Sequence, residues 1–77
     1  MKQISVEMHS FSDIQEFVSI SSRQTFEVTA GPEGQQINCK SLMAMLGLNF
    51  RRPVLVNVNC DDTEFLKFRR ETARFLA

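Results

Sequence analysis

The length and charge of the chain exclude several classes of protein before any motif is considered. Seventy-seven residues suffice for one domain, residues 1–77, with a thin hydrophobic core, and nine basic and nine acidic side chains cancel, which argues against nucleic-acid binding. No apolar run is long enough to span a bilayer and no signal peptide is recognisable, so we expect a cytoplasmic protein without membrane insertion.

The first third of the chain predicts a strand followed by a helix. Residues 2–9 place an apolar side chain at every second position, which is typical of a strand with one buried face. An apolar stripe that begins at Phe11 then recurs at helical spacing and predicts a helix over about residues 11–22. Ser12 and Gln15 fit a capping box at the start of this helix.

A hairpin and a short helix are predicted next. Residues 25–30 and 35–39 alternate on either side of turn residues, which indicates two paired strands. Ser41 has the chemistry of a helix N-cap, residues 42–46 form an almost wholly apolar helix, and Gly47 is expected to end it in a left-handed conformation. Because so short a helix is not stable alone, part of it must be buried, and the rest forms an exposed apolar patch that usually marks a partner surface.

The last third of the chain predicts one more strand and one more helix. Pro53 ends a loop, and the valine-rich residues 54–59 indicate a strand that lies either in the interior of a sheet or in a sheet whose second face is partly covered. Asp61 precedes a helix whose apolar stripe runs from Phe65 to Leu76. The order β-α-β-β-α-β-α predicts an α+β fold, an open-faced sandwich with a four-stranded antiparallel sheet and three helices on one face.

The side chains that carry chemistry do not form a recognisable catalytic set. Cys39 and Cys60 lack the spacing of a metal motif, so we expect two reduced thiols and no metal. The chain has no Ser/His/Asp set and no glycine-rich phosphate loop, so we expect no cofactor and no stand-alone enzyme activity. The one basic grouping is interpreted as a solvated loop and helix face and contains Arg51, Arg52, Arg69, Arg70 and Arg74.

Three segments and the order of the elements point to a known family. The segments are Glu16-Phe17-Val18, Thr25-Phe26-Glu27-Val28-Thr29 and, above all, Cys39-Lys40-Ser41-Leu42-Met43. Through them nearly the whole chain resembles HPr, the histidine-containing phosphocarrier of the bacterial phosphoenolpyruvate-dependent sugar phosphotransferase system. The last segment is similar to the family's A-K-S-[IL]-M/F run at the start of its short helix. The resemblance implies the HPr-like form of the open-faced sandwich.

The residues that handle phosphate in this family are not in their usual places. In the register that keeps Ser41 aligned, the family's phospho-accepting histidine falls on Ser10, its arginine on Ser12 and its proline on Asp13. His9 lies one residue too early. Acidic side chains also flank this segment, where a phosphoryl group needs positively charged partners.

Two interpretations of His9 stay open. Either it is a shifted phospho-acceptor, with Ser10 at the position of the family's catalytic residue, or it is a solvent-facing histidine without a role. In the second case Ser10 serves as the cap of the first helix. We favour the second interpretation, because the arginine and the proline of the family are missing as well.

The short helix carries the other implications of the resemblance. A serine that matches Ser41 is phosphorylated by a dedicated kinase in the Gram-positive branch of the family, so Ser41 is a candidate for regulatory phosphorylation as well as a cap. Leu42, Met43 and Leu46 correspond to the apolar surface through which the family docks on its enzymes. We expect a degenerate, regulatory HPr-like protein that binds phosphotransferase-system proteins or a transcriptional regulator through this surface. One alternative is an active phosphocarrier that accepts a phosphoryl group on His9, and a third possibility is a stand-alone module with no remaining link to sugar uptake.

Overall fold

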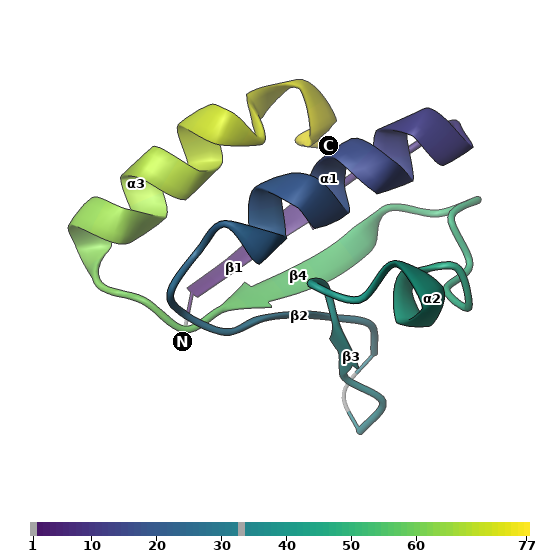
Figure 1. Ribbon diagram of the computed structural model, residues 1–77, viewed down its shortest axis with the longest axis horizontal. Helices are drawn as coiled ribbons and strands as arrows, with labels where there is room; N and C mark the ends of the chain where they lie inside the picture. The colour runs from purple at the N-terminus through teal and green to yellow at the C-terminus, as the bar shows by residue number, and fades with distance from the viewer. Residues whose placement is uncertain (1, 33) are drawn as a thin grey trace.

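Two layers make up the fold, an antiparallel sheet and the helices that cover one of its faces (Figure 1). The computed structural model describes residues 2–32 and 34–77, and within them four strands pair in the order β1-β4-β2-β3. The strands are β1 (Lys2–Val6), β2 (Val28–Ala30), β3 (Ile37–Asn38) and β4 (Val54–Val58). The helices are α1 (Phe11–Ser22), α2 (Leu42–Met45) and α3 (Asp62–Glu71), followed by a 3-10 turn, Ala73–Phe75. The predicted α+β open-faced sandwich is confirmed, and β4 lies in the interior of the sheet, which is one of the two arrangements that its sequence allowed.

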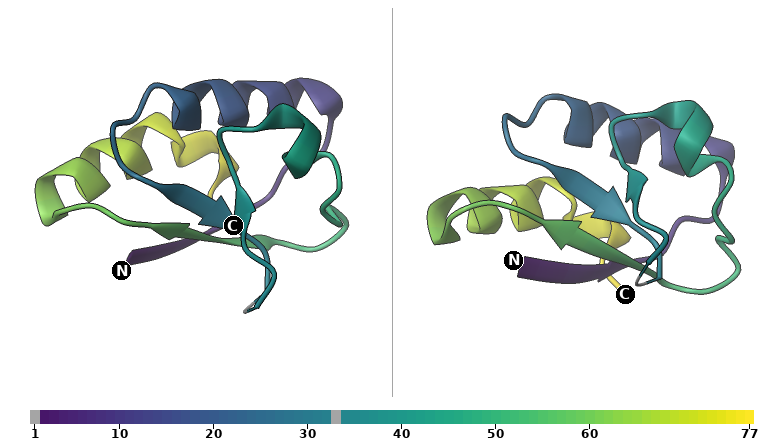
Figure 2. Two further views of the ribbon diagram at one scale, coloured as in Figure 1. Left: turned by 60° about the horizontal axis from the view of Figure 1, so that its bottom comes forward. Right: turned by 90° about the horizontal axis from the view of Figure 1, so that it is seen from below.

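The hydrophobic core lies between the sheet and helices α1 and α3, which run side by side above it (Figure 2). Phe17 on α1 is fully buried and makes edge-to-face contacts with Phe75, at 5.7 Å between ring centroids, and with Phe68, at 6.3 Å. The sheet supplies the floor beneath these rings, through the buried side chains Ile4, Val6, Val28, Ala30, Val54, Val56 and Val58. Burial of this apolar surface is the main force that holds the two layers together.

Three strands are shorter than the alternation predicted. The strand expected over residues 2–9 ends at Val6, and the hairpin strands expected over 25–30 and 35–39 pair only over Val28–Ala30 and Ile37–Asn38. Met8 lies beyond the end of β1 and is still buried. The alternating pattern therefore predicts which side chains face the core. The length of each strand depends instead on whether a neighbouring strand is present to form backbone hydrogen bonds.

The uncovered face of the sheet carries a network of side-chain amides that sequence patterns did not reveal. Gln3 donates to the Asn57 side chain at 2.8 Å, and Asn57 donates to Gln36 at 2.7 Å. Thr29 also donates to Gln36, whose own amide donates to the carbonyl oxygen of Gly31 at 3.0 Å. These bonds satisfy Asn57, which is largely buried, and tie the β2–β3 connection to the sheet.

The predictions for two helix ends have different outcomes: the cap at the start of α3 is confirmed, and the stop at the end of α2 is wrong. Asp61 caps α3 through a complete capping box with Glu64, with bonds of 2.7 and 3.1 Å, as the acidic start of this helix indicated. The left-handed stop expected at Gly47 is wrong. The described glycines with positive φ are Gly31 and Gly34 in the β2–β3 connection. At the end of α2 the chain unwinds through i→i+3 turns, and the Gly47 amide donates to the carbonyl of Ala44 at 3.1 Å.

Both cysteines are free thiols, and their surroundings predict different reactivity. Cys39 is fully buried, and burial raises its pKa to about 12, whereas Cys60 is only partly buried. We expect iodoacetamide at mildly alkaline pH to alkylate Cys60 in the native protein and Cys39 only after addition of guanidinium chloride, because the thiolate is the reactive form. Mass spectrometry of the digested protein measures both sites, and equal native rates would contradict the expectation.

The same burial makes stability depend on pH in the alkaline range. An unfolded cysteine loses its proton near pH 8.5, while Cys39 in the fold keeps its proton up to about pH 12. The native state therefore binds more protons than the unfolded state in this interval. The contribution of Cys39 to stability is present below the unfolded pKa and is lost as the pH rises through the interval.

Candidate functional site

The start of α1 is capped by Ser10. Its hydroxyl accepts a hydrogen bond from the Asp13 amide at 3.1 Å, and its carbonyl accepts from Ile14 at 3.2 Å. The capping box predicted between Ser12 and Gln15 is wrong, because the helix begins at Phe11 and Ser12 already lies in its first turn. The role of Ser10 as a cap is confirmed.

Asp13 places a carboxylate at this entrance. Its Oδ2 accepts a hydrogen bond from the backbone amide of His9 at 3.0 Å, so the carboxylate reaches back across the first turn of the helix. The bond from His9 and the guanidinium of Arg74 hold the pKa of the Asp13 carboxyl below its usual value. A negatively charged carboxylate therefore lies at the N-terminus of α1, where the helix dipole favours it.

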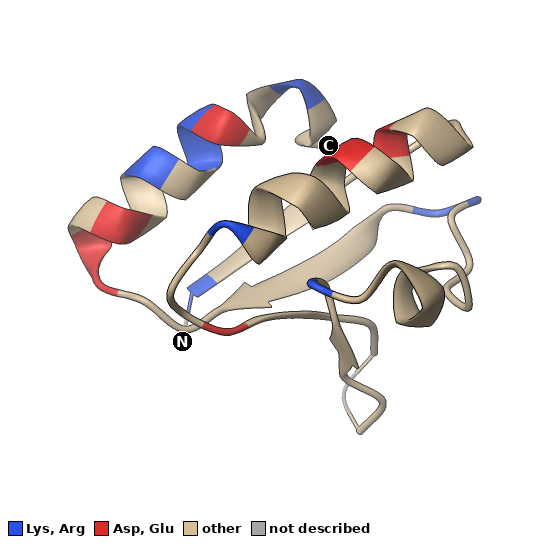
Figure 3. Ribbon diagram, in the orientation of Figure 1, with Lys and Arg blue, Asp and Glu red and all other residues tan. Residues whose placement is uncertain are grey.

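Arg74, in the 3-10 turn at the other end of the sequence, supplies the positive charge that meets this carboxylate. Its guanidinium contacts Asp13 at 3.2 Å, pairs with Glu16, and lies over the ring of Phe75 with the Cζ atom 4.1 Å from the ring centroid. Figure 3 shows the acidic positions of α1 and, close by, the basic position of the C-terminal turn. The sequence had grouped Arg74 with a solvated basic face, since nothing local reveals a contact across 61 positions.

His9 lies at the end of the β1–α1 connection with its ring in solvent. The side chain is 77% exposed, and Nε2 lies 3.7 Å from Oε2 of Glu7. In the part of the chain that the structure describes, no hydrogen bond to the ring is formed. The imidazole therefore has the carboxylate of Glu7 beside it, and it accepts no hydrogen bond from the described amides of α1.

A cavity of about 570 Å³ opens beside His9. One wall is formed by residues 7–11 and the other by residues 48–53, the segment between α2 and β4. His9 and Ser10 thus share this cavity with Arg51 and Arg52, which sequence analysis had assigned to a solvated loop. Within residues 2–32 and 34–77, no three His, Cys, Asp or Glu side chains come together in a way that could hold a metal ion.

Helix α2 divides its apolar residues between the core and the surface. Ser41 caps the helix as predicted, with its hydroxyl accepting from the Ala44 amide at 3.3 Å. Met45 is fully buried and anchors the helix, and Leu42 is partly buried against the core. Met43 is 86% exposed and Leu46 is 47% exposed. We refer to Leu42, Met43 and Leu46 together as the short-helix patch.

Phe11 adds an exposed aromatic ring at the start of α1. The sequence had placed it in the buried stripe of α1, yet it is 53% exposed and lines the cavity together with Leu48 and Phe50. It is the first residue of α1. Helical spacing identifies the direction of a side chain but not whether anything lies beneath it.

The fold places the chain in a known structural class. A solved structure described as the crystal structure of HPr-C-His from Thermoanaerobacter tengcongensis is similar to it, with a TM-score of 0.67 over 88% of this chain and 85% of that chain. The two sequences are 22% identical, so the similarity shows an HPr-like fold, as the sequence resemblance implied. No family model matches the sequence, and no curated protein matches it either. None of the described helices is both long and apolar enough to cross a membrane.

Proposed function

We propose that the chain is an HPr-like protein, related to the phosphoenolpyruvate-dependent sugar phosphotransferase system, that acts by binding partner proteins without relaying phosphate through a histidine. The observation that carries this proposal is the position of Asp13, whose carboxylate occupies the entrance to α1 and is bonded to the His9 amide. The proposal describes a degenerate, regulatory member of a phosphocarrier fold, found in the cytoplasm.

Electrostatics at the entrance support the loss of the carrier role. A phosphorylated imidazole would add up to about two negative charges and need positive partners. Glu7 instead lies 3.7 Å from His9, and Asp13 accepts the hydrogen bond of its amide. Arg74, which approaches from the C-terminal turn, is already paired with Asp13 and Glu16.

The short-helix patch supports the binding role. Met43 and Leu46 expose apolar surface to water, and such a patch usually marks a surface that binds another protein. The flexible side chain of methionine can adapt to partners of different shape. The partners proposed are phosphotransferase-system proteins or a transcriptional regulator. Ser41, immediately before the patch, is the proposed site of regulatory phosphorylation, where a phosphate would alter both the cap and the charge beside Met43.

The alternative is an active phosphocarrier that uses His9. The observation that favours it is the presence of Arg51 and Arg52 on the wall of the cavity that His9 also lines. Arg51 and Arg52 could supply positive charge from the α2–β4 connection, whereas the arginine of the family lies at the start of the first helix. The two functions differ in a single measurable product, phosphohistidine.

Incubation with phosphoenolpyruvate and the general enzyme of the phosphotransferase system separates the two functions. We expect no acid-labile phosphate on this chain, while an authentic HPr in the same reaction becomes phosphorylated. Intact-mass spectrometry under alkaline conditions measures the added phosphoryl group. A stoichiometric acid-labile phosphate that disappears in His9→Ala would instead establish the carrier function.

A further inference from the structure

The face of the sheet that the helices leave uncovered holds a second cavity, which polar side chains line (Figure 2). We refer to it as the sheet-face cavity, and the residues that matter in it are Gln3, Glu27, Thr29, Leu55 and Asn57. We infer that it binds a saccharide, a small ligand rich in hydroxyl groups, that carries no negative charge. The inference goes beyond the proposed function and does not depend on it, because the short-helix patch belongs to the helical layer on the other side of the sheet.

Three polar side chains from neighbouring strands form a row across this face. Gln3 on β1 and Thr29 on β2 both lie opposite Asn57 on β4, which stands between them. Paired positions point their side chains to the same face, so the row spans two strand spacings, about 10 Å. The cavity above the row has a volume of about 580 Å³, within the range of small-molecule sites, roughly 300–1,000 Å³.

The amides of this row are held in place before any ligand arrives. Asn57 is 9% exposed, accepts a hydrogen bond from Gln3 at 2.8 Å and donates one to Gln36 at 2.7 Å. Gln36 is fixed in turn by its bond to the carbonyl oxygen of Gly31. Side chains that are already ordered lose little conformational freedom on binding, which favours affinity in a small site.

The row keeps hydrogen-bonding groups that its own network does not use. A side-chain amide nitrogen has two hydrogens, and those of Gln3 and Asn57 each donate one bond within the described residues. The Gln3 oxygen and the Glu27 carboxylate accept none from the side chains and backbone described. A hydroxyl group both donates and accepts, so a ligand with several hydroxyls matches this mixture of free donors and acceptors.

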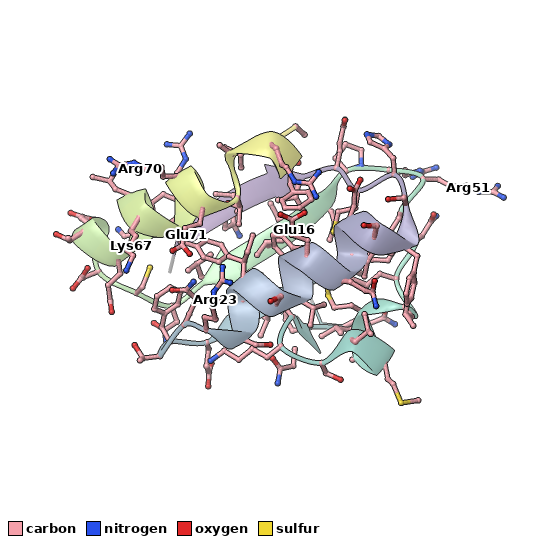
Figure 4. All side chains as sticks on the ribbon, turned by 45° about the horizontal axis from the view of Figure 1, so that its top comes forward. Glu16, Arg23, Arg51, Lys67, Arg70 and Glu71 are labelled. Carbon is pink, nitrogen blue, oxygen red and sulfur yellow. The ribbon has the colours of Figure 1, made fainter. Side chains whose placement is uncertain are left out.

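The charge of the cavity selects against anions. Among the described residues that line it, the charged one is Glu27, and the ion pairs of the described chain do not include it. Figure 4 shows Arg23, Lys67 and Arg70 on α1 and α3, in the helical layer. A phosphorylated sugar would therefore meet a carboxylate here, whereas an amino sugar would gain an ion pair.

An apolar contact completes the site. Leu55 lies on β4 opposite Ser5, one row along from Asn57, and it is 44% exposed in the cavity wall. A sugar ring has C–H groups on its faces as well as hydroxyls at its edge. Packing of these C–H groups on Leu55 would bury apolar surface while the hydroxyls meet the amides.

Other occupants fit this face less well. A helix of a partner protein covers a sheet by burying an apolar stripe, and the described wall offers it Leu55 among amides, a hydroxyl and a carboxylate. A second copy has the same difficulty, because a two-fold interface would press the same polar face against itself. A nucleic acid would place its phosphates beside Glu27.

Three probes with the same ring and different charge test the inference: glucose, glucosamine and glucose 6-phosphate. Titration of the isotope-labelled full chain at slightly acidic pH, where the amine is protonated, is followed by backbone and side-chain amide shifts. We expect glucose to bind with a dissociation constant of about 1–10 mM and to shift the side-chain signals of Gln3 and Asn57 but not of Gln15 on α1. Glucosamine should bind about fivefold more tightly than glucose 6-phosphate, as one exposed ion pair allows.

Two pairs of matched variants decide the outcome. Gln3→Leu should weaken glucose binding about fivefold or more through lost hydrogen bonds, whereas Gln15→Leu removes the same amide from the exposed side of α1 and should leave binding unchanged. Glu27→Gln should remove the preference for glucosamine. Glu7→Gln makes the same change in charge at the cavity beside His9 and should preserve the preference.

Several results would overturn the inference. These are the absence of saturation up to about 100 mM glucose, equal losses in the Gln3 and Gln15 variants, tighter binding of glucose 6-phosphate than of glucosamine, and burial of the sheet face in a homodimer seen by sedimentation. Each leaves the proposed function intact. Phosphohistidine on His9 would instead overturn the proposed function, while the sugar titrations contain no phosphoryl donor system and still test the sheet-face cavity.

Discussion

Phe17→Ala should lower the free energy of unfolding by about 3–5 kcal/mol, the cost typical of removing a buried aromatic ring and leaving a cavity. Phe17 is fully buried at the junction of the two layers, and it meets Phe68 and Phe75 edge to face. A domain of this length has a total stability of about 4–12 kcal/mol, so the loss is a large share of the total. Urea denaturation followed by circular dichroism measures the loss.

Phe11→Ala is the matched control, because it removes the same ring from the first residue of the same helix. Phe11 is 53% exposed, so the change should cost less than about 1 kcal/mol. Similar losses for the two variants would mean that Phe11 is buried in solution, and that the assignment of its ring to the exposed side of the cavity is wrong. A small loss for Phe17→Ala would contradict the packing between α1 and α3.

Met43→Asp should weaken binding of the general phosphotransferase enzyme, or of a regulator, by about 30-fold or more, which is the effect of removing a central apolar contact and burying a carboxylate. The side chain is 86% exposed, so folding stability should change by no more than about 0.5 kcal/mol. Isothermal titration calorimetry against the purified partner measures the affinity, and urea denaturation verifies that the fold is unchanged.

Leu66→Asp provides the control for this prediction. Leu66 is another large apolar residue with high exposure, 61%, but it lies on α3 and is not part of the short-helix patch. It should leave the affinity unchanged. If both variants weakened binding equally, the effect would come from the added negative charge, and if neither did, the short-helix patch would not be the docking surface.

The entrance to α1 is the feature on which the proposed loss of the carrier role depends. The helix still begins with a polar cap, yet its first turn is occupied by the carboxylate of Asp13, which Arg74 partly neutralises. The Ser10 hydroxyl accepts from the Asp13 amide and the Asp13 carboxylate accepts from the His9 amide, so two backbone amides at this entrance have partners within the chain. This arrangement stabilises the start of α1, while the short-helix patch stays exposed to solvent.

The sequence by itself determined the order of the elements, the bounds of α1, the N-cap at Ser41 and the inward face of the sheet. Each of these follows from short-range chemistry, since periodicity and cap residues act within one or two turns of a helix or along one strand. For β4 the sequence left two possibilities, an interior strand or a sheet whose second face is partly covered, and the pairing of β4 with both β1 and β2 decided for the interior position.

Only the tertiary structure decided the pairing of Arg74 with Asp13, the amide network around Asn57, the exposure of Phe11, and the meeting of His9 with Arg51 and Arg52 across one cavity. These features join segments that are distant along the chain, or depend on where the packed layers end. No local pattern encodes them, because a side chain's partner across the fold is selected by the packing of whole elements and not by its neighbours in sequence.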